Sequence, residues 1–222
     1  MKIEQTTIKF LKDVEKNNNR EWFNAHKAQY ETALENVNQF KDEVVKGLNK
    51  KDMIEEGKVF RIYRDVRFSK DKAPYKNNLG IAFKRATKAR RGGYYLHLEP
   101  GKSLVAGGFW APEPADLKRI REEFAHDDKT IRKITSQKKF IQYFGTLEGD
   151  ELKTAPPGYD RDHPAIDLIR KKQYLVTRKF SDKEVTSPDF LKEVIQTFEA
   201  MRPYLDYMSD VLTTDKNGQK LI

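Results

Sequence analysis

The stretch VFRIYRDVRFSKDKAPY (residues 59–75) organises the chain, because it joins a strong strand pattern to the densest alternation of charged and aromatic residues. Successive side chains of a strand point to opposite faces of a sheet. The pattern therefore predicts a strand over residues 59–68 with one packed face and one polar face. The two faces are Phe60, Ile62, Arg64, Val66 and Phe68 on one side and Arg61, Tyr63, Asp65 and Arg67 on the other.

The strand is expected to end in the polar loop before Pro74, since proline cannot donate a hydrogen bond to a sheet. Three arginines and three lysines lie within residues 61–76, and guanidinium groups can bind phosphate or carboxylate through two hydrogen bonds. Asp65 and Asp71 could hold these cations in place. The candidate anion-binding residues are Arg61, Arg64, Asp65, Arg67, Lys70, Lys72 and Lys76.

An exposed strand face is the alternative interpretation of this pattern. Alternating charges on such faces form cross-strand pairs that contribute about 0.2–1 kcal/mol each, without any ligand. Arg64 favours the functional interpretation, because it lies among large apolar residues and a buried cation needs an acceptor. We expect Arg64 to be held by a carboxylate or directed into a pocket.

The composition indicates a globular protein. With 222 residues, 37% hydrophobic content and 13 Phe, 10 Tyr and 2 Trp, the chain can bury a substantial core. We predict a single domain over residues 1–222, with a frayed tail after about residue 213. The chain has no cysteine, so disulfides and thiolate metal sites are excluded. The charged start and the lack of a long apolar run predict a cytoplasmic protein without a membrane partner.

The net charge of +9 is concentrated in one segment. Residues 58–102 hold 13 Lys and Arg against 3 Asp and Glu, whereas the rest of the chain holds 30 basic and 31 acidic residues. This localisation indicates an anionic ligand, either a small molecule or a nucleic acid.

Periodicity elsewhere predicts the remaining elements. Apolar residues at three- and four-residue spacing predict a long helix over residues 20–48 and another that begins after residues 187–189. Further strands are expected over residues 79–84, 94–99, 103–110 and 174–179, and residues 145–162 form either a long loop or a strand pair. The fold class is α+β: a mainly antiparallel sheet of about four to six strands with long N- and C-terminal helices packed on it.

The third expected strand adds a titratable group to the site. Tyr94, Leu96 and Leu98 form its apolar face, which leaves Tyr95, His97 and Glu99 on the other face. His97 and Tyr75 are the candidate catalytic residues for proton transfer, since histidine has an unperturbed pKa of about 6.5. The alternative is a histidine that is only hydrogen-bonded on a sheet face.

Several other chemistries lack support. The four histidines show no metal-ligand spacing, so no metal site is predicted, and no cofactor is identified. The sequence contains no glycine-rich nucleotide-binding loop and no G-x-S-x-G nucleophile motif.

Five motifs carry a family resemblance: NNREWF (18–23), VFRIYRDVRFSKDKAPYK (59–76), YYLHLEP (94–100), a Gly-Gly-aromatic stretch followed by PEP (107–114), and PPGYDRDHP (156–164). Together they resemble a widespread bacterial family of conserved hypothetical proteins, a domain of unknown function, over nearly the whole chain. The resemblance implies a single-domain bacterial protein, and it transfers no activity, cofactor or catalytic residue.

The preferred function is binding, and possible turnover, of a phosphate- or carboxylate-bearing small molecule in a basic cleft. Here Arg61, Arg67 and Lys72 would hold the anion, while Arg64 and Asp65 would brace the site. The alternative is a nucleic-acid-binding domain that uses residues 58–102, with the basic turn at residues 84–91 on the phosphate backbone. A third hypothesis is a protein-interaction domain with an exposed apolar patch around Phe109 and Trp110.

Overall fold

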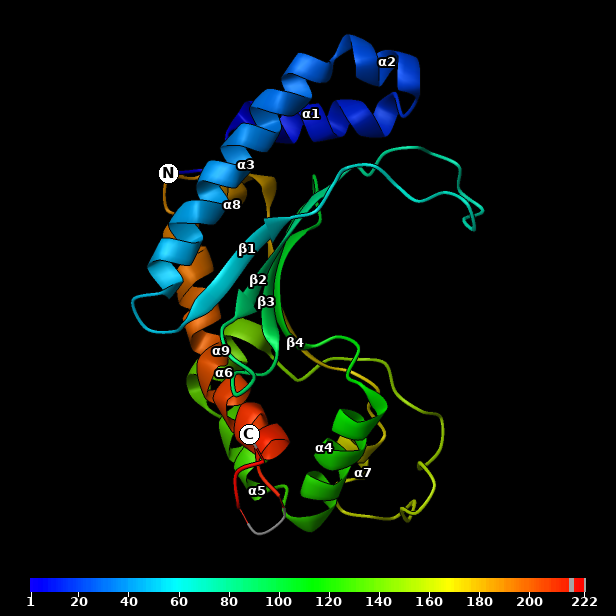
Figure 1. The fold of residues 1–222 in the computed structure, drawn as a ribbon, viewed down its shortest axis with the longest axis vertical. Coiled ribbons are helices and arrows are strands. Elements are labelled where there is room, and N and C mark those ends of the chain that lie inside the picture. Colours follow the sequence, from blue (N-terminus) through cyan, green and yellow to red (C-terminus); the bar gives the residue numbers. More distant parts are fainter. Residues whose placement is uncertain (216–217, 222) are drawn as a thin grey trace. The chain divides into compact units, whose positions relative to one another are not determined.

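A computed structural model describes residues 1–215 and 218–221 of the protein (Figure 1). The chain divides into two compact units. Unit 1 comprises residues 1–84, 95–105 and 179–196, and unit 2 comprises residues 85–94, 106–178 and 197–222. The single-domain expectation stays a prediction.

The strands form one antiparallel sheet, in which neighbours in sequence are also neighbours in space. Its order is β1 (Ile54–Val59), β2 (Leu79–Arg85), β3 (Gly93–Leu98), β4 (Ser103–Phe109) and β5 (Tyr174–Phe180). Helices precede and follow these strands, so the α+β class, the strand number and the terminal helices are confirmed.

Unit 1 begins with α1 (Gln5–Lys16), α2 (Arg20–Ala25) and α3 (Lys27–Leu48), and α3 packs against both α1 and β1. Asn19 caps α2 by accepting a 2.9 Å hydrogen bond from the Trp22 amide. Unit 1 also contains α8 (Asp182–Val185) and the start of α9 (Phe190–Thr213). The first residue of α9, Phe190, stacks on Phe40 of α3.

The single helix expected over residues 20–48 is wrong, because the chain breaks between α2 and α3. The break lies at His26, whose φ of −111° and ψ of 18° are not helical. Its Nδ1 atom lies 2.7 Å from the Trp22 carbonyl oxygen, and its ring stacks on the Trp22 indole. The His26 side chain thus hydrogen-bonds to a backbone carbonyl of the preceding turn, whereas in a regular helix such carbonyls bond only to backbone amides.

Unit 2 contains α4 (Pro114–His126), α5 (Lys129–Thr135), α6 (Lys138–Phe144), α7 (Ile166–Ile169) and the rest of α9. Tyr94 packs on Phe198, and the buried Tyr204 hydroxyl donates to the Tyr174 carbonyl at 2.8 Å. The segment 145–162 is a long loop with isolated bridges at Glu148 and Glu151. In the tail, Thr214 bridges Lys220, while residues 216, 217 and 222 lie outside the described residues.

The strand predicted over residues 59–68 is also wrong. The first strand ends at Val59, and residues 60–78, here called the arm, run outside the sheet between β1 and β2 (Figure 1). The arm pairs with itself: the Arg64 amide donates to the Pro74 carbonyl, and the Lys76 amide donates to the Ile62 carbonyl. Of the apolar face expected here, Ile62 is buried, whereas Phe68 is 96% exposed. The two halves of the arm therefore hydrogen-bond to each other and not to a strand of the sheet.

Candidate anion-binding site

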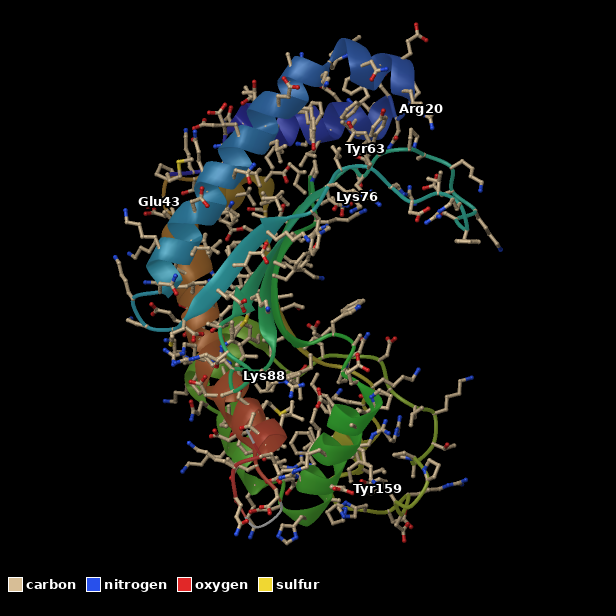
Figure 2. All side chains as sticks on the ribbon, viewed as in Figure 1. Arg20, Glu43, Tyr63, Lys76, Lys88 and Tyr159 are labelled. Carbon is tan, nitrogen blue, oxygen red and sulfur yellow. The ribbon has the colours of Figure 1, made fainter. Side chains whose placement is uncertain are left out.

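A cavity of about 630 Å³ opens in unit 1 beside the arm. It is lined by the end of α1, the turn before α2, the arm and β3. The lining residues are Glu15, Asn18, Arg64, Asp71, Ala73, Tyr75, Lys76, Asn77, Asn78 and Tyr95. Of the residues that the sequence predicted, Arg64, Tyr75 and Lys76 are among them, and Figure 2 labels Lys76 on the returning half of the arm.

Asn18 holds the arm against the helices. Its side chain accepts a hydrogen bond from the Tyr75 amide at 3.0 Å and donates one to the Tyr75 carbonyl at 2.9 Å. The Tyr75 ring stacks on Phe23 with ring centroids 3.9 Å apart, and only 5% of the residue is exposed. Burial, together with the nearby Tyr63 hydroxyl, raises the pKa of Tyr75, so this phenol is neutral at physiological pH.

Arg64, which was expected to be held by a carboxylate or directed into a pocket, has a carboxylate partner. Its guanidinium pairs with Asp71, seven residues away, and the same residue lines the cavity. Hydrogen bonds from the Ala73 amide and from Arg64 lower the pKa of Asp71. The carboxylate therefore stays ionised and fixes the orientation of Arg64.

Lys76 is the cation in the cavity wall that lacks a carboxylate. Its Nζ atom donates to the Arg61 carbonyl at 3.0 Å, and no ion pair to Lys76 or Arg61 occurs among the residues that the structure describes. Burial and the positive charges of Arg61 and Arg64 lower the pKa of Lys76. These charges repel one another, so an anion beside Lys76 would be attracted by all of them, while the Glu15 and Asp71 carboxylates of the same lining would repel it.

The other predicted cations lie outside the cavity lining. Arg67 binds Asp65 through two hydrogen bonds of 2.9 and 2.6 Å, and 76% of its side chain is exposed. Lys72 donates to the Val66 carbonyl at 3.0 Å, and Lys70 is exposed. The outer part of the arm is therefore a solvated, locally paired loop.

Tyr95, His97 and Glu99 share one face of β3 and its end, as the strand period predicts. The Tyr95 hydroxyl lies 3.1 Å from His97 Nδ1, and His97 Nε2 lies 2.8 Å from a Glu99 oxygen. The other oxygen of Glu99 accepts from Asn77 at 3.3 Å and from Lys102 at 3.2 Å. Burial alone would raise the pKa of Glu99, but the hydrogen bonds from His97 and Lys102 leave it lowered overall.

Sequence reasoning missed the asparagines. Asn18 lies 57 residues from Tyr75, and nothing in the run of three asparagines at positions 17–19 marks one of them as a binding partner. Asn77 and Asn78 follow the charged motif directly, but they carry no charge that would mark them as site residues. The cavity therefore combines charged groups that composition reveals with amides that it does not.

The basic turn needed by the nucleic-acid hypothesis and the apolar patch needed by the protein-interaction hypothesis are both less exposed than expected. In the basic turn, Arg85 is 2% exposed and pairs with Asp206, and Arg91 pairs with Asp116. In the expected apolar patch, 70% of Trp110 is exposed but Phe109 is buried.

Two further features are absent from the described part of the chain. No group of three or more histidine or acidic side chains could hold a metal ion among residues 1–215 and 218–221. In the same residues, no helix has the length and apolar character needed to cross a membrane.

Comparison with known proteins adds one finding. Neither a curated protein nor a solved structure matches the chain. A family model with the description "Conserved hypothetical protein (DUF2461)" matches residues 6–207, which is most of the sequence. The chain therefore belongs to this family of conserved hypothetical proteins, as its five sequence motifs indicated.

Proposed function

We propose that the cavity in unit 1 binds a small molecule that carries a phosphate or a carboxylate. The observation that carries this proposal is Lys76, an ammonium group in the cavity wall that has no carboxylate partner among the described residues and has two arginines nearby. A bound anion would compensate this charge. We place this binding in the bacterial cytoplasm, in keeping with the family motifs and a chain without cysteine.

The roles of the arm residues follow from their positions. Lys76 and Arg64 are the anion-binding cations, because both line the cavity. Asp71 orients Arg64, and Arg61 adds positive potential beside Lys76. Arg67 and Lys72, which the sequence analysis expected to hold the anion, do not line the cavity and are not assigned to it.

A pocket is favoured over a nucleic-acid surface because the basic turn has few cations to offer. Arg85 is buried and Arg91 is paired with Asp116, whereas Lys84, which pairs with Glu55 at 2.9 Å, keeps 67% of its side chain exposed. A phosphate backbone is recognised by several accessible cations at once. Lys88, on the exposed tip of this turn (Figure 2), serves as the matched control for Lys76.

The test is a thermal-shift screen of the wild type, Lys76→Met and Lys88→Met against phosphate, sugar phosphates, dicarboxylates, nucleotides and short oligonucleotides. A ligand at about 100 times its dissociation constant adds about 2.7 kcal/mol to stability, which raises the midpoint by several degrees. We expect a small anion to shift the wild type and Lys88→Met alike, and to bind Lys76→Met at least about tenfold more weakly.

Two results would contradict the proposal. One is an equal shift of the wild type and Lys76→Met by every stabilising small anion. The other is stabilisation by oligonucleotides alone, with an affinity that falls steeply with salt and is weakened by Lys88→Met, which would favour the nucleic-acid hypothesis.

A further inference from the structure

The hydrogen-bonded chain on β3 ends at the cavity. Tyr95 is both the first member of this chain and a lining residue, so its hydroxyl connects the cavity to His97 and Glu99. We propose that Tyr95 is a catalytic residue whose proton His97 accepts, and that the substrate is an anionic ester. This inference rests on the proposed anion site.

The hydrogen bonds from Tyr95 through His97 to Glu99 run in one direction, from donor to acceptor. The Glu99 carboxylate can only accept, so the neutral imidazole of His97 that fits this geometry has hydrogen on Nε2 and accepts the Tyr95 hydroxyl proton at Nδ1. Asn77 and Lys102 fix the other oxygen of Glu99. The order of hydroxyl, imidazole and carboxylate is that of a hydrolase triad, in which the carboxylate orients the imidazole and stabilises its cation.

Tyr95 needs this base. Burial, and next the negative charge of Glu99, raise the pKa of its hydroxyl, so that little phenolate exists at neutral pH. Tyr75 also lines the cavity, but its ring lies against Phe23 and the structure shows no histidine bonded to its hydroxyl among the described residues. Of the two phenols, Tyr95 is therefore the one prepared for proton transfer.

The proposed step balances without any further reactant. The Tyr95 oxygen bonds to the carbonyl carbon or phosphorus of the ester, and the Tyr95 proton passes to His97 Nδ1. The bond from that centre to the alcohol oxygen then breaks, and the departing oxygen takes the proton from His97. This step gives a tyrosyl ester and a free alcohol. Water then attacks the same centre, gives its proton to His97 and displaces the Tyr95 oxygen, which takes that proton back, so the acid is released and Tyr95 is restored. Lys76 and Arg64 hold the anionic part of the substrate throughout.

The experiment measures the reactivity of Tyr95 with 4-carboxybenzenesulfonyl fluoride, whose carboxylate suits the cation site. Here the Tyr95 oxygen bonds to sulfur, the sulfur–fluorine bond breaks, fluoride leaves and His97 takes the proton. We expect peptide mass spectrometry to locate the label on Tyr95 and to find none there in Tyr95→Phe. We expect His97→Ala to label at least about tenfold more slowly, and added imidazole to restore the rate.

Glu99 is a positioning residue, so Glu99→Gln should also slow labelling. The conservative variant Glu99→Asp, which keeps the charge, should recover part of the rate, whereas a purely structural role would make the two variants alike. Labelling of a different tyrosine in the wild type, or equal rates for the wild type and His97→Ala, would overturn the relay.

A neutral probe separates this inference from the anion site. Benzenesulfonyl fluoride lacks the carboxylate, so the rate advantage of the anionic probe over it should shrink in Lys76→Met, and both probes should label Tyr95 more slowly in His97→Ala. If the anionic probe is no faster than the neutral one and Lys76→Met changes neither rate, the anion site fails while the relay stands. If small anions stabilise the wild type but His97→Ala labels normally with both probes, the relay fails while the anion site stands.

Discussion

Two pairs of arginines in the basic segment look alike in sequence and differ in structure. Arg64 and Arg67 of the arm pair with aspartates seven and two residues away. Arg85 and Arg91 of unit 2 pair with Asp206 and Asp116, which lie 121 and 25 residues away. The side chain of Arg85 is 1% exposed, whereas that of Arg67 is 76% exposed.

The difference separates arginines that build the fold from those that can serve a ligand. A long-range pair closes only when the chain has folded, and removal of one buried partner leaves the site without compensation. A pair between near neighbours on an exposed loop contributes little to stability. The arm can therefore carry charge for a ligand without a structural role for each cation.

The largest expected effect comes from Arg85→Met. Arg85 also donates to the Arg91 carbonyl at 3.1 Å and to the Ser209 hydroxyl at 3.3 Å. We expect the loss of these bonds and of the ion pair to lower the free energy of unfolding by about 3 kcal/mol, as measured by urea denaturation.

Arg67→Met is the matched control, because it removes the same group from the exposed pair. We expect no measurable change in its urea midpoint, since both side chains of this pair are exposed. Equal destabilisation by the two substitutions would break the comparison between the two pairs.

A smaller effect on stability and a larger one on the site are expected from Gly80→Ala. An added Cβ at residue 80 would lie 2.4 Å from the Tyr95 hydroxyl oxygen, so this hydroxyl must move. We expect labelling of Tyr95 by 4-carboxybenzenesulfonyl fluoride to fall at least about tenfold, with anion-induced thermal shifts retained. Unchanged labelling would mean that the position of the Tyr95 hydroxyl beside His97 does not control its reactivity.

The smallest expected effect is the pH dependence due to Glu99. Its pKa in the folded protein is below the ordinary value of 4.5, so its contribution to stability is complete above that value and is lost as the pH falls through the folded pKa. Between about pH 6 and pH 3, Glu99→Gln should therefore lose less stability than the wild type. Parallel slopes in urea denaturation at several pH values would contradict this assignment.

Much of the fold could be predicted because local patterns determine it. The alternation in YYLHLE predicted the β3 faces. The strand predicted over residues 59–68 failed because its period of two describes an extended chain, and an extended chain can pair with itself instead of a sheet. The break at His26 depends on a side-chain contact that periodicity cannot reveal.

The site could be predicted only in part for the same reason. Composition located the cations, but it could not distinguish Lys76 in the cavity wall from Lys72 on the exposed loop. Nor could it reveal that Asn18 holds Tyr75, because that contact depends on how α1 and the arm meet in the folded unit. Asp65 and Asp71 were identified as partners of the arginines because these pairs are local.

The most direct test of the anion site is a crystal structure of the protein soaked in selenate, with the anion located from its anomalous scattering. We predict a selenate peak in the unit 1 cavity within hydrogen-bond distance of Lys76 Nζ and the Arg64 guanidinium, and no such peak in Lys76→Met. Selenate bound only at the basic turn around Lys88, with the cavity empty in the wild type, would contradict the account.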